Sequence, residues 1–312
     1  MAIPGPGVPL SVNDIATEFG GTVPHGLNEY YRGGGLVPNT PGNSAIPASG
    51  QIAVGDFYGS ANRSSIPLVI STDSYNYDVY SVASTNPTYV AGTSDITVTV
   101  NPGVTVGSTA TPTYAMLVPS SFNPGDTVTI VNNGVIQGRG GNGGAGGTGS
   151  PSIPANTAGS PGLAGGNAIY VNRPTVITNN GVVASGGGGG GGGGSSRPVT
   201  PAPPKGTPTV RSYGGGGGGG GAGFDGGSGG AGGPGATGSG SPGSVGTSPA
   251  GGAGGPAPGA GPGGSGGGRG AAGAAGATSR TSGGAGGAAG NYIVGNPFVT
   301  WPVTGTQQGG VA

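Results

Sequence analysis

Few residues in this sequence have types and spacing that could support catalysis. His25 is the only histidine, so no second imidazole exists for a metal pair, and we interpret His25 as a loop residue. Asp126 and Asp225 are far apart in sequence, and nothing around them favours a glycosidase that uses two carboxylates. Lys205 precedes a glycine, the reverse of the order in a phosphate-binding loop. The sequence therefore predicts no enzyme, no cofactor and no metal site.

The composition argues against several classes of partner. The chain has 312 residues, of which 83 are glycine and 30 are proline, and only 6% are charged. Its nine basic and nine acidic residues balance, whereas nucleic-acid binding needs a concentrated basic surface. No run of about 18 apolar residues exists, so we expect no membrane insertion. The first residues lack the pattern of a secretory signal, and we expect synthesis in the cytoplasm.

Residues 1–62 have the pattern of a small docking module. Ser11 followed by Asp14 is typical of a capping box, and apolar residues recur at helical spacing from Val12 to Phe19. Gly20 and Gly21 follow and end this run. Aromatic residues in "GLNEYYRGGG" and "SGQIAVGDFYGS" predict a thin core. We therefore expect a helix over 12–19 inside a compact module.

Residues 63–137 have the pattern of an all-β domain. "YNYDVYSV" and "DITVTVNP" alternate apolar or aromatic residues with polar ones, the period of a half-buried strand. Asn133-Gly134 lies between two β-branched runs, and this dipeptide favours a type I′ hairpin. The segment therefore predicts a β-sandwich-like collar with an antiparallel hairpin near 133–134.

An apolar phrase recurs in the rest of the chain. It begins at Gly125, Gly166 and Gly290, and its first two copies end in Asn-Asn-Gly-Val. We expect these phrases to anchor the glycine-rich tracts between them. The predicted anchors are Val128, Ile130, Val135, Ile169, Val171, Val176, Ile177, Val182, Ile293, Val294, Phe298, Val299 and Trp301.

The glycine tracts repeat every three residues. From Gly138 the chain reads G-R-G, G-N-G, G-A-G, G-T-G, which leaves two faces of a threefold helix without side chains. Helices with three residues per turn have no internal hydrogen bonds, and only glycine lets their backbones pack closely enough to bond laterally. We therefore predict a bundle of polyglycine II helices over 138–312. The runs Gly186–Gly194 and Gly214–Gly221 would be its most buried members.

Two other structures compete with this bundle. A glycine- and serine-rich tract is often a flexible linker, and ordering each residue costs about 1–2 kcal/mol of backbone entropy. A collagen triple helix needs glycine at every third residue, and that register slips near Ser241. A cooperative bundle clamped by the apolar phrases fits the repeat better than either alternative.

The phrases "GRGGNGGAGG" and "ASGGGGGGGGG", opened by "NNGVI" and "NNGVV", resemble the glycine-rich adhesins at the ends of tailed-bacteriophage tail fibres. The opening module and the closing "GNYIVGNPFVTWPVTGTQQGGVA" also resemble segments of phage tail and fibre proteins. The resemblance covers the N-terminal module, the C-terminal half and the phrase near 125–147, but not 65–115. It implies loops displayed on a glycine scaffold.

The resemblance implies receptor-binding loops wherever the glycine pattern is interrupted. Four segments interrupt it: 150–163, 195–213, 239–250 and 277–282. Their side chains would contact an outer-membrane protein or polysaccharide of the host. The candidate residues are Asn156, Arg197, Lys205, Arg211, Tyr213, Ser244 and Arg280.

Together these observations predict a mostly β and irregular virion tail-fibre or tail-tip protein with three domains. Residues 1–62 would bind other tail or fibre proteins, 63–137 would form the collar, and 138–312 would present the receptor loops. Phage fibres are threefold, which implies either a homotrimer or a single copy on a trimeric fibre. The alternatives are a structural connector without receptor contact and an ice-binding protein, which would need no docking module.

Overall fold

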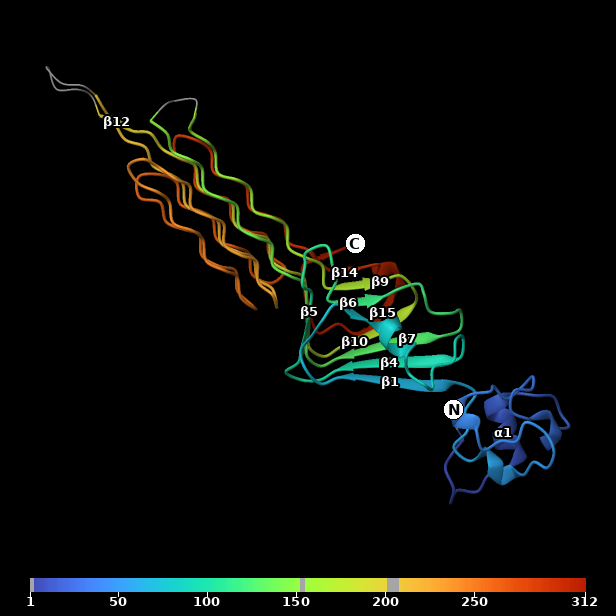
Figure 1. Ribbon diagram of the computed structural model, residues 1–312. Coiled ribbons are helices and arrows are strands. Elements are labelled where there is room, and N and C mark those ends of the chain that lie inside the picture. The colour runs from blue at the N-terminus through green and yellow to red at the C-terminus, as the bar shows by residue number, and fades with distance from the viewer. Residues whose placement is uncertain (1–2, 152–154, 201–207) are drawn as a thin grey trace. The chain divides into compact units, whose positions relative to one another are not determined.

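The computed structural model describes residues 3–151, 155–200 and 208–312. The chain forms two compact units, of which the first comprises Met1–Leu68, Tyr80–Val98 and Ser120–Thr129, and the second the remaining residues. Most of the described chain is strand or irregular backbone with a few short helices, as predicted (Figure 1). In this described part, no helix is long and apolar enough to cross a membrane.

The predicted helix at the N-terminal end is confirmed as α1 (Val12–Phe19). Its capping box is present, because the Ser11 N–H donates to Asp14 Oδ2 at 2.8 Å and the Ser11 side chain accepts from the Asp14 N–H. Phe19 packs edge-to-face on Phe57, with ring centroids 6.3 Å apart. The 3-10 helices of this region are η1 (Leu27–Glu29), η2 (Pro41–Asn43) and η3 (Val54–Phe57).

Short strands form three five-stranded sheets in the described chain, with strand orders β1-β4-β7-β10-β15, β16-β11-β8-β5-β2 and β17-β14-β9-β6-β3. The chain passes through the three sheets in turn, and we call each such pass a coil. The first strands of the coils are β1 (Ser64–Ile70), β4 (Ser94–Val100), β7 (Thr127–Asn132), β10 (Thr175–Asn179) and β15 (Val299–Val303). The second strands are β2 (Ser74–Tyr75), β5 (Thr105–Gly107), β8 (Val135–Gln137), β11 (Val182–Ala184) and β16 (Thr306–Gln308). The third strands are β3 (Tyr77–Asp78), β6 (Met116–Val118), β9 (Ile169–Val171), β14 (Asn291–Val294) and β17 (Gly310–Val311).

The stacked coils correct the prediction of a β-sandwich with an antiparallel hairpin at 133–134. β7 and β8 belong to different sheets, and β8 pairs in parallel with β5 and β11. Asn133-Gly134 turns the corner between sheets, and a Cβ at Gly134 would overlap the Val104 carbonyl of the preceding coil. Close stacking of coils, rather than local turn preference, therefore determines this glycine. "YNYDVYSV" is also not one strand, because α2 (Val79–Ala83) follows β3 directly.

The Asn-Asn-Gly-Val repeat stacks on itself from one coil to the next. Asn132 Nδ2 donates to Asn179 Oδ1 at 2.8 Å, and both side chains are fully buried. Asn179 Nδ2 in turn donates to the Thr304 carbonyl at 2.6 Å. Val182 pairs with Val135 in the parallel register. The repeat is therefore a ladder of buried amide bonds, which satisfies polar groups inside the coils.

Most predicted anchors line the coils, but two do not. Ile130, Ile169, Ile177 and Ile293 have no exposed surface, as expected for anchors. Val176 and Phe298 are 36% and 43% exposed, so the prediction was wrong for these two. Val176 lies between buried residues on a strand of alternating burial, which turns its side chain outward. Phe298 ends a short 3-10 helix, η5 (Asn296–Phe298), outside the strands.

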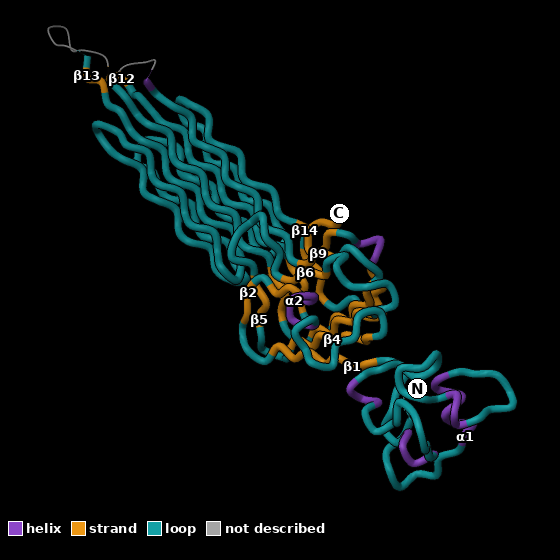
Figure 2. The backbone as a smooth tube through the Cα atoms, turned by 45° about the vertical axis from the view of Figure 1, so that its right-hand side comes forward, coloured by secondary structure: helices purple, strands orange, loops and turns teal. Residues whose placement is uncertain are grey.

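The glycine tracts are inserted between the second and third strands of two coils. Residues 138–168 connect β8 to β9, and residues 185–290 connect β11 to β14. The inserted chain runs back and forth in laterally bonded segments, which together we call the glycine bundle (Figure 2). These segments are 138–149, 157–166, 186–194, 214–222, 227–233, 239–246, 251–255, 261–267, 271–277 and 283–290.

Backbone bonds between segments repeat every three residues. The N–H groups of Gly141, Gly144 and Gly147 donate to Gly187, Gly190 and Gly193 at 2.8–2.9 Å. Segment 186–194 donates to 157–166, 214–222 and 271–277, and it accepts from 138–149, 261–267 and 283–290. All its glycines are buried, as are Gly214–Gly221, which confirms the prediction for both runs. One chain supplies all these neighbours, so the segments are neither a flexible linker nor a three-chain collagen helix.

Candidate functional site

The glycine bundle has two different ends. At one end its segments continue into β8, β9, β11 and β14. Figure 1 shows the segments running side by side away from these strands, and the turns at the opposite end form what we call the far end. The described far-end residues belong to the loops 150–156, 195–213, 234–238, 256–260 and 278–282.

A hairpin forms the longest far-end loop, 195–213. Its strands β12 (Val199–Thr200) and β13 (Thr209–Val210) pair antiparallel, and Ser196 and Tyr213 exchange backbone bonds of 2.9 and 3.0 Å below them. The Tyr213 ring packs against Gly238 and Gly259, where a Cβ would lie 3.0 and 2.9 Å from ring atoms. The root of the hairpin is therefore seated on neighbouring loops. The predicted site residue Lys205 lies outside the described residues.

Hydroxyl groups join the hairpin root to one more far-end loop, 278–282, and to the start of the bundle segment 157–166. The Ser195 N–H donates to Thr281 Oγ1 at 2.8 Å, and both hydroxyls donate to the Thr157 carbonyl at 2.8–2.9 Å. Asn156 Oδ1 accepts from the Ser150 N–H at 2.7 Å, which closes the loop 150–156. These bonds give the far end a pre-ordered backbone, and such preorganisation lowers the entropy lost on binding.

The structure brings most predicted site residues to the far end, but not Ser244. Arg197, Arg211, Tyr213 and Arg280 lie there with Asn156. The Ser244 N–H instead donates to Ala253 at 2.9 Å within segment 239–246, so Ser244 is an exposed residue on the side of the bundle. The prediction of a loop at 239–250 was therefore wrong.

The period of three explains this error. Gly240, Gly243 and Gly246 keep the lateral bonds, while Ser241, Pro242 and Val245 occupy positions that do not need glycine. The turn that follows lies at the strand end of the bundle, where Ser248 Oγ donates to Gln137 Oε1 at 2.7 Å. Segment 150–163 was also predicted too long, because Ser160 and Leu163 already bond laterally to Ala145 and Asn142.

Two far-end loops were missed by reading the sequence. These are 234–238 and 256–260, which contact Tyr213 through Gly238 and Gly259. Their signal is the proline at which each glycine run stops, Pro234 in the first loop and Pro256 and Pro258 in the second. The glycine phase also shifts by one residue between Gly233 and Gly240, which marks a turn.

The balanced net charge conceals a strong separation of charge along the chain. Residues 1–137 contain two basic and eight acidic residues, a net charge of 2 − 8 = −6. Residues 138–312 contain seven basic residues and Asp225 alone as acid, a net charge of 7 − 1 = +6. Asp225 lies in the turn 223–226 at the strand end, 3.7 Å from Arg139. The far end is therefore cationic without any carboxylate.

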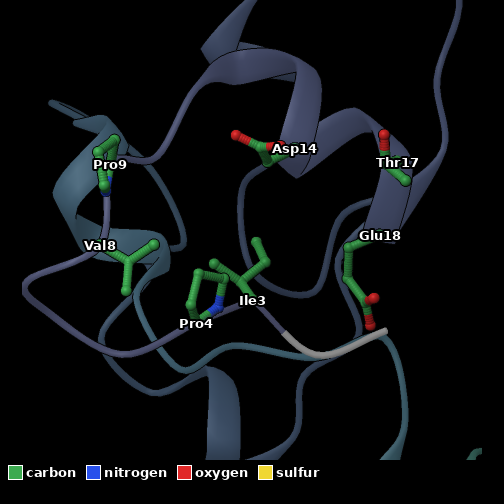
Figure 3. Close-up of a pocket in the computed structure, with 7 residues that line it drawn as sticks. All are labelled: Ile3, Pro4, Val8, Pro9, Asp14, Thr17 and Glu18. Carbon is green, nitrogen blue, oxygen red and sulfur yellow. The ribbon is translucent and has the colours of Figure 1, made fainter.

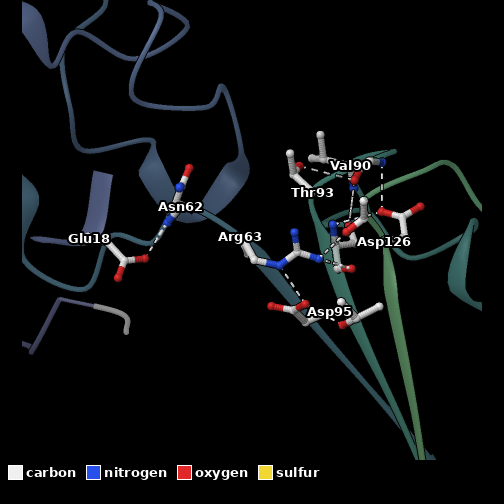
Figure 4. Close-up of polar contacts among 11 residues, drawn as sticks. Glu18, Asn62, Arg63, Val90, Thr93, Asp95 and Asp126 are labelled. Atoms are coloured by element: carbon white, nitrogen blue, oxygen red, sulfur yellow. Dashed lines mark hydrogen bonds and ion pairs between the residues drawn. The ribbon is translucent and has the colours of Figure 1, made fainter. Parts of the chain in front are cut away.

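The acidic residues of the first unit have structural partners. Asp126, 4% exposed, accepts the N–H groups of Gly92 and Ser94 at 2.8 and 3.0 Å and the Tyr89 hydroxyl at 2.8 Å (Figure 4). Arg63 pairs with Asp95 at 2.7 Å in the same region. The buried Asp126 carboxylate thus holds neighbouring loops together through hydrogen bonds. Within the described chain, no cluster of His, Cys, Asp or Glu could hold a metal ion.

The N-terminal module has a surface pocket of about 240 Å³ beside α1 (Figure 3). Hydrogen bonds from Ser11 hold the pKa of Asp14 below its ordinary value. Glu18 Oε1, one turn further along, accepts the Asn62 N–H at 2.7 Å (Figure 4). The pocket therefore has apolar and acidic walls. Its lining residues are Ile3, Pro4, Val8, Pro9, Asp14, Thr17 and Glu18.

Residues 65–312 match a family model described as phage tail fibre adhesin Gp38. The chain belongs to this family. As a Gp38-type adhesin it is a receptor-binding protein of the phage tail fibre and not an enzyme, which confirms the predicted function class and the location in the virion tail. The match begins after the N-terminal module, so 1–64 lie outside it.

A solved structure is also similar to this Gp38-type chain. It is the crystal structure of the gp37-gp38 adhesin tip complex of the bacteriophage S16 long tail fiber. The identity is 20%, the TM-score is 0.48, and the similarity covers 85% of this chain and 89% of the other. No curated protein sequence shows detectable similarity to the chain.

Proposed function

We propose that the glycine bundle is an array of polyglycine II helices that presents its far-end loops to the bacterial surface. The lateral bonding in threes and the burial of Gly186–Gly194 support this helix type. The observation that carries the proposal is the seating of the hairpin 195–213 on three neighbouring loops. Residues at the base of this hairpin have a fixed backbone position, because their backbone is hydrogen-bonded to the neighbouring segments of the bundle.

The proposed receptor surface keeps most of the predicted residues. Arg197, Arg211, Tyr213 and Arg280 lie in or beside the hairpin, and Lys205 belongs to it in sequence. Asn156 supports the neighbouring loop through its bond to Ser150. Ser244 is not part of this surface. An outer-membrane protein or a surface polysaccharide of the host remains the proposed receptor.

We also propose that residues 1–62 attach the adhesin to its fibre. Three observations support this: the module has its own core around Phe57, it lies outside the family match, and its helix α1 borders an open pocket. The gp38 of phage S16 is found in complex with gp37, and we propose a fibre protein of that kind as the partner here. The domain boundaries stay predictions, at 1–62, 63–137 and 138–312. The choice between a homotrimer and a single copy on the fibre also stays a prediction.

Deletion of 197–211 tests the receptor assignment. We expect phage carrying this deletion to assemble normally and to lose most adsorption to host cells. The variant Ser244→Ala is the matched control, because it changes an exposed side chain on the side of the bundle and should adsorb like wild type. Normal adsorption by the deletion variant would contradict the proposal and favour a purely structural connector.

A further inference from the structure

The arginines of the far end differ from the other arginines in their partners. Arg63 pairs with Asp95 at 2.7 Å, and Arg269 Nε donates to Gln137 Oε1 at 3.0 Å. Arg32, Arg139 and Arg173 likewise interact with other groups of the chain. Among the residues that the structure describes, the guanidinium groups of Arg197, Arg211 and Arg280 have no hydrogen-bonded or ion-paired partner. These three donors are available to a ligand.

Backbone bonds place these three arginines around the short stretch 195–198, just before β12. The Arg280 N–H donates to the Ser195 carbonyl at 3.2 Å, and the Arg211 N–H donates to the Pro198 carbonyl at 3.1 Å. Ser195 and Pro198 are three residues apart, which spans about 10 Å of extended chain. Arg197 lies between them. The three cationic residues therefore branch from one patch of backbone at the hairpin root.

The three arginine side chains are exposed to different degrees. Arg211 and Arg280 are exposed, whereas Arg197 is half-buried. Arg197 Nε is buried and has no partner in the described part of the chain. A buried donor without a partner is uncommon in folded proteins, and a ligand oxygen that reached this atom would satisfy it.

No acidic side chain lies in the far-end loops beside these arginines. The sequence has no acidic residue in 127–224 or in 226–312, and Asp225 lies at the opposite end of the bundle beside Arg139. Like charges on one patch repel, and a bound anion removes that repulsion. Arginine binds phosphate through two parallel N–H bonds, a geometry that lysine lacks.

The side chains around the arginines favour a saccharide over a protein loop. Protein interfaces are centred on buried aromatic or large apolar anchors. The described far-end loops consist mainly of Ser, Thr, Gly, Ala and Pro; their one large exposed apolar side chain is Val199, at 47% exposure. Tyr213 is already packed on Gly238 and Gly259. The surface thus offers charge and hydroxyl groups with almost no apolar anchor.

We infer that Arg197, Arg211 and Arg280 bind phosphate groups on a phosphorylated surface saccharide of the host. This inference rests on the proposal that the far end faces the host. The guanidinium groups would each contact phosphate oxygens, and the neighbouring loop hydroxyls would contact sugar hydroxyls. Binding would weaken as salt rises, since exposed charges are screened beyond about 10 Å at 0.1 M ionic strength.

Vesicles that contain purified host lipopolysaccharide test this inference with the full-length protein. We expect the triple variant R197Q/R211Q/R280Q to bind on the order of 100-fold more weakly than wild type, because each of the three contacts contributes about fivefold. Removing phosphate from the lipopolysaccharide should weaken wild type to a similar degree. The variant R197K/R211K/R280K keeps the charge without the paired N–H geometry. Its affinity for the vesicles should lie between those of wild type and the triple glutamine variant.

Arg32→Gln is the matched control, because it removes one positive charge from the half-buried Arg32 of the N-terminal module, away from the hairpin loop, and should leave vesicle binding unchanged. Equal binding of wild type and the triple glutamine variant, or equal binding to dephosphorylated vesicles, would overturn the inference. Binding only to vesicles that carry an outer-membrane protein would overturn it too. If the deletion of 197–211 abolishes adsorption while the glutamine variant adsorbs normally, the receptor role stands and the phosphate assignment fails.

Discussion

The stacked coils and the glycine bundle both pair their backbone N–H and C=O groups with neighbouring segments, but the two regions are stabilised in different ways. In the coils, strands alternate buried and exposed residues, and isoleucines such as Ile136, Ile169 and Ile177 fill the interior. In the bundle, nearly every buried position is glycine and neighbouring backbones touch directly. The coils therefore gain stability from apolar burial, whereas the bundle depends on dense hydrogen bonding between close chains.

The connection between the two regions compensates for the weakness of the bundle. Glycine loses more conformational freedom on folding than any other residue, and here it buries almost no side-chain surface. Each inserted stretch begins and ends in paired strands, at β8 and β9 for 138–168 and at β11 and β14 for 185–290. The coils thus hold both ends of each stretch close together, which reduces the entropy that the bundle must offset.

A side chain on a bare face of the bundle should have the largest effect. A Cβ at Gly143 would overlap the Gly218 carbonyl, so we expect Gly143→Val to lower the free energy of unfolding by about 4 kcal/mol or more. Ala145→Val, at an exposed position of the same segment, should cost less than about 0.5 kcal/mol. Denaturant unfolding of both variants measures the difference. Equal losses would contradict the close packing of the bundle.

Truncation of a buried coil residue should have the next largest effect. Ile177 is fully buried, and Ile177→Ala should lower the free energy of unfolding by about 3 kcal/mol through lost burial and a cavity. Its exposed neighbour serves as the control, since Val176→Ala should change stability by less than about 1 kcal/mol. A small effect at Ile177 would show that the coils do not depend on apolar burial.

Breaking the asparagine ladder should have an intermediate effect. Asn132→Ala removes the bond to Asn179 Oδ1, which keeps only the longer bond from the Gly181 N–H, and it also removes the acceptor of the buried Gly134 N–H. Together these losses should cost about 1–3 kcal/mol. A double-mutant cycle with Asn179→Ala measures the coupling between the two side chains. Strictly additive losses would mean that the ladder does not link the coils energetically.

The smallest effect concerns pH and α1, outside both regions. The pKa of Asp14 is lowered by its bonds to Ser11, so the ionised carboxylate stabilises the helix start. This contribution is present above the ordinary pKa of 3.8 and is lost as pH falls through the lowered value. Asp14→Asn should therefore flatten the acid dependence of amide exchange in α1 while exchange in the bundle stays unchanged. An unaltered profile would contradict this role.

Local pattern predicted those features that depend on local geometry. The capping residues predicted α1, and the period of three predicted lateral packing of the glycine segments. The prediction of a β-sandwich was wrong because alternation predicts strands without showing which strands pair. Gly134 is required by its close contact with the preceding coil, and not by a hairpin turn at Asn133-Gly134. The loop at 239–250 was wrong because outward positions tolerate Ser, Pro and Val within a segment.

The candidate site was only partly predictable for a related reason. Arg197 and Arg211 could be placed in one interrupted segment, but nothing in the sequence shows that Arg280 bonds to Ser195 or that Gly259 supports Tyr213. These contacts depend on how many times the chain reverses direction between the two residues of each pair, which the sequence does not show. The cationic character of the far end was available in the sequence, but the balanced sum over the whole chain concealed it.

Amide hydrogen exchange in Gly186–Gly194 tests the central claim most directly. Every N–H in this run donates to a neighbouring segment, and the run has no side chain that could hold it in place otherwise. If the glycine bundle is a rigid, laterally bonded scaffold, these amides should exchange as slowly as those of β7 and β10. Exchange at the rate of an unstructured glycine chain would contradict the account.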